Sequence, residues 1–357
     1  MRTKNKIVIL FVSAFFLLMS LWGLFSDTPN YSESERRVLT SFPDVNMVDI
    51  SSGYFSKEFD TYAVERFPAR DKWRQIKTYV KTKLFFQQDN NGIYTAGQHI
   101  SKIDYPLNTQ MLDYAIQLFA DIKDNYLDKN NIYLAVIPDK NKYLAENTGH
   151  LAFDYEEFSA YLAENMAYAK YIEISDLLDS DDYYHTDSHW RQDKIVDVAD
   201  RIASVMGVDI SQKYSYYTLE TDFYGVYAGQ SALKCEPDTI TYLLNESIKN
   251  ANVRGAEAIY DMKKAKSRDP YEMFLSGNQP VVTITNSQCE NQKRLIIFRD
   301  SFGSSIAPLF IDGYSEIILI DLRYISSDKL SEFVDFENAD VLFLYSTILL
   351  NNSRSMK

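Results

Sequence analysis

The 357-residue chain contains few of the residues that usually mark metal-binding or redox proteins. It has two cysteines and four histidines, and neither a Cys-x-x-Cys nor a His-Glu-x-x-His pattern occurs, so no zinc signature is present. We therefore predict no metal and no organic cofactor. Cys235 and Cys289 leave two alternatives open, a disulfide and a pair of free thiols.

Positive charge is also in short supply. Lys and Arg number 37 against 50 Asp and Glu, which gives a formal net charge of −13. Such a chain repels phosphates, so its charge argues against a nucleic-acid partner. Internal repeats and low-complexity tracts are absent from the sequence. Hydrophobic residues make up 46% and charged residues 24%, which is ordinary globular composition and excludes wholesale disorder.

Tyrosine and phenylalanine, by contrast, are abundant, with 27 and 21 copies. Tyrosine-rich surfaces suit carbohydrate, because the ring covers the C–H face of a sugar while the hydroxyl stays hydrated. The alternative is that these rings are ordinary core and surface residues, and composition leaves both interpretations open.

One long hydrophobic run lies at the N-terminus. Residues 7–25 carry no charge over nineteen positions, and Arg2, Lys4 and Lys6 precede them. A run of this length can cross a bilayer as a helix, and basic residues at its start hold that end in the cytoplasm. A cleaved signal peptide is the alternative, but bulky residues continue to Phe25 without a clear small-x-small site. We predict a signal anchor over residues 1–27, spanning the cell membrane once and leaving the C-terminal domain extracytoplasmic.

The next part of the chain changes from a tether to a helical pattern. Residues 28–50 hold two prolines, several serines and a charged cluster, which is typical of a linker. Residues 55–86 show apolar positions at helical spacing interrupted by Pro68, which predicts two helices. Residues 93–97 indicate a short hairpin. We predict a single extracytoplasmic domain over residues 51–357.

From about residue 110, helical and strand patterns alternate. Continuous apolar strands separated by helices predict a mainly parallel sheet covered on both faces, which is an α/β doubly wound sandwich. Residues 207–292 lack a clean period and indicate an irregular insertion of loops and short strands. The predicted helices are 111–125, 156–169 and 193–206, and the predicted strands are 132–137, 171–174, 295–298, 317–320 and 341–345.

Ser301 follows the predicted strand 295–298, in the stretch Arg299-Asp300-Ser301-Phe302-Gly303. The carboxyl ends of parallel strands form the ligand crevice of such sheets. A serine there, at the start of the next helix, lies beside free backbone N–H groups that can hold an oxyanion. The simpler alternative is that Asp300 or Ser301 caps the helix.

Asp187 and His189 stand two residues apart in the stretch Asp187-Ser188-His189-Trp190. In an extended turn both side chains point roughly the same way, so the carboxylate can orient the imidazole while the imidazole faces a serine. A surface histidine with Asp187 as a helix cap is the alternative, and His185 is a competing histidine. Together with Ser301, these residues form the parts of a serine nucleophile with its base and orienting acid.

The two stretches, in this order, resemble the DHHW family and, more broadly, the SGNH-hydrolase-like alginate O-acetyltransferase proteins. The resemblance covers about residues 30–350, and in those proteins the Asp-x-His pair also precedes the serine. It implies an SGNH-like fold in which Ser301 is the nucleophile, His189 the general base and Asp187 its orienting carboxylate. Weaker similarities are Glu35-Arg36-Arg37-Val38-Leu39 with Phe42-Pro43, Phe67-Pro68-Ala69-Arg70-Asp71, Pro138-Asp139-Lys140 and Asp321-Leu322-Arg323-Tyr324.

The chain departs from the family pattern in two places. Ser188 stands where the family name implies the first of two histidines, and Arg299 replaces the glycine usual before Asp-Ser in SGNH esterases. The resemblance also implies backbone oxyanion donors at Ser301 and Gly225, the latter in the block 223–227.

Further candidate residues lie near strand ends and in the same glycine-containing block. Lys140, Arg323 and Tyr227 are candidate substrate contacts. The alternatives are a turn glycine at position 225 and structural ion pairs or solvated surface positions for the two basic residues.

Proteins of this kind typically work beside a polytopic membrane acyltransferase that passes acyl groups outward. The resemblance therefore implies an O-acetyltransferase for an exported polysaccharide or cell-wall glycan. One alternative is an SGNH-type carbohydrate esterase, a deacetylase, in which water is the acceptor. Another is a catalytically silent glycan-binding assembly protein that keeps the fold.

Overall fold

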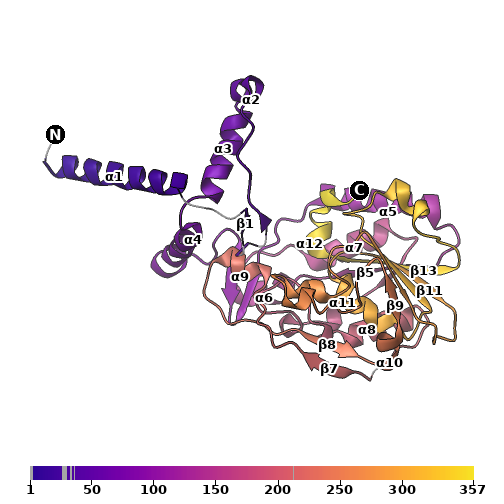
Figure 1. The fold of residues 1–357 in the computed structure, drawn as a ribbon. Helices are drawn as coiled ribbons and strands as arrows, with labels where there is room; N and C mark the ends of the chain where they lie inside the picture. Colours follow the sequence, from indigo (N-terminus) through magenta and orange to yellow (C-terminus); the bar gives the residue numbers. More distant parts are fainter. Residues whose placement is uncertain (1–2, 26–29, 33, 36, 212) are drawn as a thin grey trace. The chain divides into compact units, whose positions relative to one another are not determined.

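The computed structural model describes residues 3–25, 30–32, 34–35, 37–211 and 213–357. Positions 1–2 and 26–27 of the predicted anchor and 28–29, 33 and 36 of the predicted linker lie outside the described residues. The chain forms two compact units (Figure 1). Met1–Asn90 with Ala228–Lys234 makes the N-terminal unit, and Asn91–Tyr227 with Cys235–Lys357 makes the main unit. The domain boundaries at residues 27 and 50 stay predictions.

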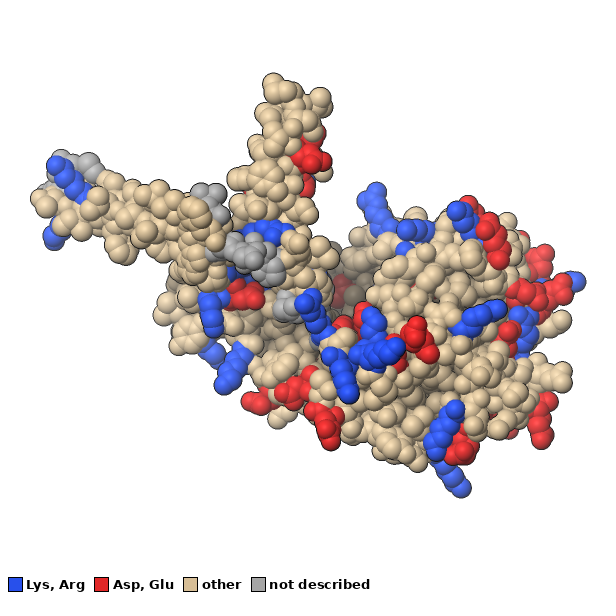
Figure 2. Space-filling view, viewed as in Figure 1, with Lys and Arg blue, Asp and Glu red and all other residues tan. Residues whose placement is uncertain are grey.

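The N-terminal unit begins with a long apolar helix, α1 (Thr3–Phe25). Its segment Thr3–Gly23 has a mean hydropathy of 2.1 and, within the described residues, is the one helix long and apolar enough to cross a membrane. Figure 2 shows basic side chains at the N-terminal end of this helix, ahead of an uncharged stretch. Length and composition thus agree with the predicted membrane segment. Its orientation stays a prediction.

Short helices and a two-stranded ribbon make up the rest of this unit. Pro68 separates α3 from α4, as the sequence predicted, because its ring cannot continue a helix. α2 is an additional helix, and its cap Asn46 accepts a hydrogen bond from the backbone N–H of Asp49. The bounds are β1 (Tyr31–Ser32), β2 (Arg37–Val38), α2 (Met47–Ser52), α3 (Tyr54–Glu65), α4 (Arg70–Tyr79) and the π-helix η1 (Val80–Leu84).

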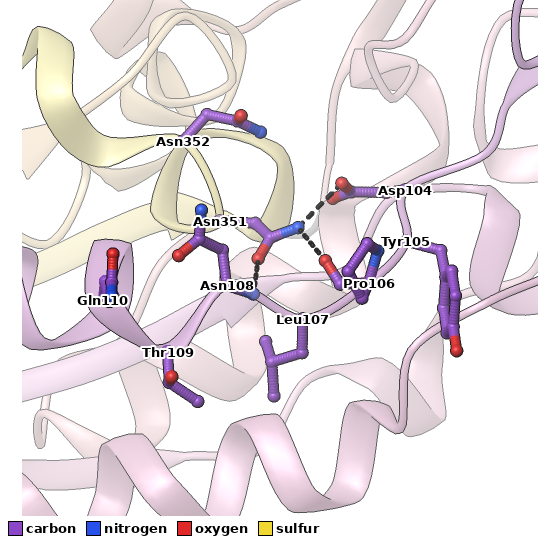
Figure 3. A pocket seen from close by; sticks show the side chains of 9 residues that line it. All are labelled: Asp104, Tyr105, Pro106, Leu107, Asn108, Thr109, Gln110, Asn351 and Asn352. Atoms are coloured by element: carbon purple, nitrogen blue, oxygen red, sulfur yellow. Dashed lines mark hydrogen bonds between the residues drawn. The ribbon is translucent and has the colours of Figure 1, made fainter.

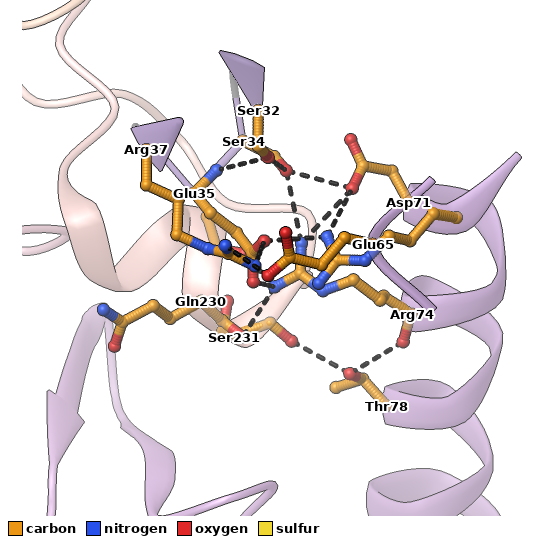
Figure 4. Close-up of polar contacts among 12 residues, drawn as sticks. Ser32, Ser34, Glu35, Arg37, Glu65, Asp71, Arg74, Thr78, Gln230 and Ser231 are labelled. Carbon is orange, nitrogen blue, oxygen red and sulfur yellow. Dashed lines mark hydrogen bonds and ion pairs between the residues drawn. The ribbon is translucent and has the colours of Figure 1, made fainter. Parts of the chain in front are cut away.

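An ion-pair network centred on Glu35 holds these elements together (Figure 4). The Glu35 carboxylate lies 3.1 Å from Arg37, 2.7 Å from Arg70 and 3.5 Å from Arg74. Arg74 also donates to the carbonyl of Gly229 at 2.8 Å. These contacts explain why residues 228–234 belong to the same unit as the first 90 residues.

A seven-stranded sheet forms the centre of the main unit, in the order β6-β5-β13-β11-β12-β10-β9. The five strands from β6 to β12 run parallel to one another. β10 pairs antiparallel with β12, and β9 pairs antiparallel with β10. The sequence prediction of a mixed α/β unit with a mainly parallel sheet is therefore confirmed. The strands are β5 (Ile132–Ile137), β6 (Lys170–Ile172), β9 (Asn252–Arg254), β10 (Val281–Thr285), β11 (Arg294–Arg299), β12 (Glu316–Ile320) and β13 (Ala339–Ser346).

Alternate residues of the central strands enter two hydrophobic cores, one on each face of the sheet. In β5, Tyr133, Ala135 and Ile137 face one core, and the residues between them face the other. Helix α8 covers the first face, and α5 and α7 cover the second (Figure 1). The α-helices of this unit are α5 (Thr109–Tyr126), α6 (Asn141–Thr148), α7 (Tyr155–Asn165), α8 (Val196–Val205), α10 (Glu246–Asn250), α11 (Gly303–Ile306) and α12 (Thr347–Leu350).

Residues 207–292 are more regular than the sequence predicted. β10 and β9 join the main sheet, whereas β7 (Ser215–Thr218) and β8 (Thr241–Leu244) form a separate antiparallel pair. Helix α9 (Val226–Ser231) links the two units in sequence. The predicted hairpin is present as β3 (Ile93–Ala96) and β4 (His99–Lys102). Both cysteines are free thiols.

Charged side chains of both signs are interspersed over the visible face of the main unit (Figure 2). That face shows no broad basic area.

Candidate functional site

Ser301 lies directly after β11, in the turn that leads into α11. Asp300 fixes this turn, because one carboxylate oxygen accepts from Phe302 N at 3.0 Å. The other oxygen accepts from the backbone N–H and the hydroxyl of Ser346, at the end of the neighbouring strand β13, at 2.9 and 2.6 Å. Asp300 thus anchors the turn and leaves Ser301 partly exposed. The helix-cap alternative is wrong, because the N-cap of α11 is Phe302 and no side chain caps this helix.

The packing of the turn also requires glycine at position 303. A Cβ built on Gly303 would lie 2.6 Å from Cβ of Arg299, whose side chain is completely buried. Arg299 reaches Asp321 at 3.6 Å, and its Nε and Nη2 have no hydrogen-bond partner among the described residues. The arginine that replaces the usual glycine is therefore an interior residue beneath the turn rather than a substrate contact.

A continuous chain of hydrogen bonds joins Asp187, His189 and Ser301. His189 Nε2 lies 2.7 Å from Ser301 Oγ, and His189 Nδ1 lies 2.6 Å from Asp187 Oδ1. The two stretches that the sequence singled out, separated by more than 100 residues, are thus brought together at the end of the sheet. This is the geometry by which an imidazole can accept the proton of a hydroxyl while a carboxylate stabilises the resulting imidazolium.

Asp187 is fixed in place by backbone donors as well as by the imidazole. Its side chain is 3% exposed, accepts from His189 N at 3.0 Å, and accepts from Val226 N at 2.8 Å. Gly225 packs directly on this loop, and a Cβ there would lie 2.3 Å from Asp187 Cβ and 2.4 Å from Thr186 O. Only glycine allows the two backbones to approach so closely.

The His189 ring lies between two aromatic rings. Tyr271 stacks on it at 3.9 Å and 17°, and Phe302 lies at 4.8 Å. The Tyr271 hydroxyl donates to Ser305 Oγ at 2.9 Å, and Trp190 Nε1 donates to the same oxygen at 2.9 Å. Sequence reasoning missed Tyr271, which lies inside the stretch predicted as an irregular insertion. One tyrosine among 27 carried no local signal.

The two predicted oxyanion donors differ in their surroundings. The backbone N–H of Ser301 has no acceptor within the part of the chain that the structure describes. The N–H of Gly225 donates to Thr186 Oγ1 at 2.8 Å, so this hydrogen bond already occupies the predicted donor. The competing histidine, His185, lies against His99 and has its Nδ1 3.7 Å from Asp238.

Lys140 and Tyr227 are buried rather than exposed at a cleft. Lys140 is 1% exposed, its Nζ donates to the carbonyls of Tyr184 and His185 at 2.8 and 2.9 Å, and it lies 5.2 Å from the centre of the Tyr227 ring. Burial lowers the pKa of the Lys140 ammonium to about 7, although the charge of Asp187 opposes this effect. The lysine therefore supports the loop that leads into Asp187.

Arg323 is bound at both ends of its guanidinium by Asp321, at 2.8 and 2.6 Å. Burial alone would lower the pKa of the arginine, but the bidentate pair with Asp321 outweighs this effect and raises it. The side chain keeps 22% of its surface exposed. The structural ion pair expected as an alternative is thus present, and the remaining exposure leaves room for a contact outside the protein.

A separate polar pocket of about 470 Å³ opens at the start of α5, and none of the predicted site residues lines it. Figure 3 shows Asn351 between Asp104 and Asn108, bonded to both. Burial raises the pKa of Asp104 to about 6, and the nearby charge of Asp139 adds to this effect.

Comparison with solved structures finds similar folds at low sequence identity. A DHHW family protein from Eubacterium siraeum aligns with a TM-score of 0.59 at 21% identity, over 75% of this chain and 94% of that one. PatB1 from Bacillus cereus, solved with a sulfonyl adduct, aligns with a TM-score of 0.56 at 17% identity, over 72% and 95%. The O-acetyltransferase domain of AlgJ from Pseudomonas putida gives a TM-score of 0.45 at 12% identity, over 73% and 93%.

No family model and no curated protein sequence matches the chain. The resemblance to the DHHW family, inferred from two short motifs, is confirmed by these neighbours at the level of the fold.

Proposed function

We propose that this protein is an O-acetyltransferase that acts on an exported polysaccharide or cell-wall glycan, on a doubly wound fold of the SGNH-hydrolase type. The observation that carries the proposal is the unbroken hydrogen-bond chain from Asp187 through His189 to Ser301. Serine hydroxyls are common at strand ends, but a serine bonded to an imidazole that is itself bonded to a buried carboxylate fits one use best. That use is nucleophilic acyl transfer.

In the first half-reaction, Ser301 Oγ attacks the carbonyl carbon of an acyl donor while His189 Nε2 takes the hydroxyl proton. The carbonyl π electrons move to oxygen, and Ser301 N–H is the donor for this oxyanion. Collapse of the tetrahedral intermediate breaks the bond to the leaving group, which takes the proton from His189. The product is acetyl-Ser301 and a neutral leaving group.

In the second half-reaction, a sugar hydroxyl attacks the acetyl-enzyme. His189 removes its proton, the acetyl group passes to the sugar oxygen, and the proton returns to Ser301 Oγ. Asp187 remains ionised and stabilises the imidazolium of both steps. Water in place of the sugar gives the esterase, so the same residues serve both activities and the acceptor alone decides between them.

Four further residues are proposed to contribute to substrate binding, either by direct contact or by supporting the loop that carries Asp187. Arg323 keeps part of its guanidinium exposed and is the candidate for direct contact. Lys140 and Tyr227 contribute from beneath the loop that carries Asp187. Gly225 contributes through its close packing on that loop, with its N–H engaged by Thr186.

The proposed location follows from α1. With its basic end in the cytoplasm, the helix spans the cell membrane once and places the main unit outside. A polytopic membrane acyltransferase is the proposed donor partner, because an extracytoplasmic enzyme has to receive its acyl groups from across the membrane.

The proposal is tested with the full-length protein in detergent. Acetyl release from p-nitrophenyl acetate is expected for the wild type and is expected to fall to background in Ser301→Ala and His189→Ala. Ser304→Ala, three residues further along in helix α11, is the matched control and keeps its activity. Absence of turnover, or turnover that survives in Ser301→Ala, contradicts acyl transfer at this site.

Acceptor oligosaccharides then separate the candidate activities. The transferase produces acetylated oligosaccharide faster than free acetate, whereas the deacetylase releases acetate from acetylated glycan. A protein that binds oligosaccharide without either turnover is the silent assembly protein.

A further inference from the structure

Two histidines and an aspartate come together away from the proposed active site. One ring nitrogen each from His99 and His185 and one carboxylate oxygen of Asp181 lie within 4.8 Å of one another. His99 Nε2 is 3.3 Å from Asp181 Oδ1, and the two histidine rings meet edge to face at 4.5 Å. None of these three side chains takes part in the chain of hydrogen bonds that ends at Ser301.

We propose that His99, Asp181 and His185 bind Zn²⁺, with water completing the coordination. Two imidazoles and a carboxylate are a donor set that divalent transition metals prefer, whereas Mg²⁺ and Ca²⁺ prefer oxygen ligands alone. This proposal departs from the sequence-based prediction of no metal. It stands independently of the proposed acyl-transfer function.

The three donor atoms are near enough to reach one tetrahedral ion after a small movement. Zinc lies about 2.0–2.1 Å from nitrogen and oxygen ligands, which puts ligand atoms about 3.4 Å from one another. The His99–Asp181 pair already has this separation, and the widest pair has to close by about 1.4 Å at most. Asp181, with 79% of its side chain exposed, can shift toward either histidine.

The backbone around the histidines is fixed before any ion binds. His99 is in β4, and the carbonyl of His185 accepts from Ile100 N at 2.8 Å and from Lys140 Nζ at 2.9 Å. Asp238 accepts from His185 N at 2.8 Å and lies 3.7 Å from the His185 ring, where it can orient the imidazole. Rigid placement of two ligands lowers the entropy cost of binding.

The His99 ring is only 7% exposed, and its Nδ1 has no hydrogen-bond partner among the described residues. The Nε2 atom of the same ring lies 3.3 Å from Asp181 Oδ1, so the imidazole already directs a donor atom toward the carboxylate of the proposed site.

A bound ion would cross-link three segments that are distant in sequence: β4, the 3-10 helix Ser180–Asp182, and the loop that enters the Asp187-His189 turn. Because His185 is two residues before Asp187, the ion would hold the start of that turn. Its role is structural, and no chemical step passes through it.

The proposal is tested by metal binding to the full-length protein, purified in detergent without a polyhistidine tag and stripped with a chelator. Zinc is added, weakly held ions are removed, and the bound metal is counted by mass spectrometry. Competition with a chromophoric chelator gives the affinity. One Zn²⁺ per chain is expected, unaffected by excess Mg²⁺. Co²⁺ in its place is expected to give the intense visible bands of a tetrahedral site.

His99→Gln and His185→Gln are expected to weaken zinc binding at least about tenfold, since even loss of an outer-shell partner commonly costs 10–100-fold. His150→Gln, a histidine outside the cluster, is the matched control and keeps full affinity. Asp181→Asn alters an exposed side chain, so it tests the site even if a histidine variant fails to fold. Zinc affinity that is equal in the wild type, Asp181→Asn and His185→Gln, or no bound zinc in the wild type, overturns the proposal.

Discussion

Each unit of the chain contains one carboxylate that several donors surround, and the two carboxylates are used differently. Asp187 is buried, whereas Glu35 keeps 16% of its side chain exposed. Glu35 in the N-terminal unit is surrounded by the guanidinium groups of Arg37, Arg70 and Arg74. Asp187 in the main unit is bonded instead to the imidazole of His189 at 2.6 Å and accepts from the backbone N–H groups of His189 and Val226 at 3.0 and 2.8 Å. Arginine closes the first network with fixed charge, whereas the second leads through a titratable ring to a hydroxyl.

The difference separates a structural ion pair from a candidate catalytic one. Burial alone would raise the pKa of Glu35, but the hydrogen bond from Arg70 and the charges of the three arginines outweigh this effect and lower it. Arginine cannot exchange a proton near neutral pH, so that network can only hold its elements together. Histidine can, and the Asp187 network ends at the partly exposed Ser301 hydroxyl.

Replacing the carboxylate by an amide in each unit should give the largest difference in kcat between the two networks. Asp187→Asn leaves the shape of the site but removes the charge and the acceptor that fix the histidine tautomer. We expect kcat for acetyl release to fall by about 10⁴-fold with little change in the substrate KM.

Glu35→Gln is the matched control. It is expected to leave kcat within about threefold while increasing hydrogen exchange in α4, since loss of one partner leaves arginines unpaired. Equal losses of kcat in the two variants would show that Asp187 acts only through stability.

Gly225→Ala should show how far kcat depends on the position of Asp187, because it displaces the carboxylate without removing it. The added methyl group would lie 2.3 Å from Asp187 Cβ, so one of the two segments has to shift. We expect kcat to fall by about 100-fold, as is common for displacements of about 1 Å at a reacting group. A crystal structure of the variant checks the displacement, and unchanged kcat would exclude a requirement for this packing.

Lys140 provides a third contrast, because this buried cation has carbonyl acceptors where Arg70 has a carboxylate. Its folded-state pKa of about 7 lies below the ordinary value of 10.5. Between pH 7 and 10.5 the unfolded chain binds more protons at this lysine than the folded chain does. The free energy of unfolding therefore rises with pH across this window, and this stabilisation is lost again as pH falls through about 7. The slope due to Lys140 is at most about 1.4 kcal/mol per pH unit.

Lys140→Met should remove that slope. The measurement is urea unfolding of the wild type and Lys140→Met between pH 7 and 9. Hydrogen exchange in β5 and β13 monitors the unfolding of the main unit. Parallel pH profiles for the two proteins would contradict a neutralised lysine.

Substitutions of Tyr271 are expected to have the smallest effect on kcat. Two variants separate the contribution of its stacking on His189 from that of its hydrogen bond to Ser305. Tyr271→Phe keeps the ring on His189 and loses only the bond to Ser305, so kcat is expected to stay within about threefold. Tyr271→Leu loses the aromatic ring that stacks on the imidazole, and we expect about a tenfold loss of kcat because the ring no longer fixes the orientation of His189. Wild-type kcat in Tyr271→Leu would show that the stacked ring has no part in acetyl release.

The sequence predicted the parallel strands well because each is a continuous apolar run bounded by polar residues. β5 has the predicted bounds, and β11 extends one residue beyond its prediction at each end. β10 was missed, because Val281–Thr285 lies in a Tyr-, Gly- and Pro-rich stretch whose pairing with β12 is set by distant residues.

The site was predictable to the extent that it lies in short motifs. Asp187, His189 and Ser301 lie in two such motifs, whereas Tyr271 and the His99–Asp181–His185 cluster depend on segments that meet only in the folded chain. Burial of Lys140 likewise follows from its tertiary environment, since a lysine after a strand is more often exposed.

The most direct test of the account is the identity of the acylated residue. The full-length protein is treated briefly with p-nitrophenyl acetate, or with a sulfonyl fluoride that captures activated hydroxyls, and its peptides are analysed by mass spectrometry. The account predicts modification at Ser301, none at Ser304 or Ser305 in the adjoining helix α11, and strong loss of labelling in His189→Ala. An unmodified Ser301, or labelling there that does not depend on His189, would contradict it.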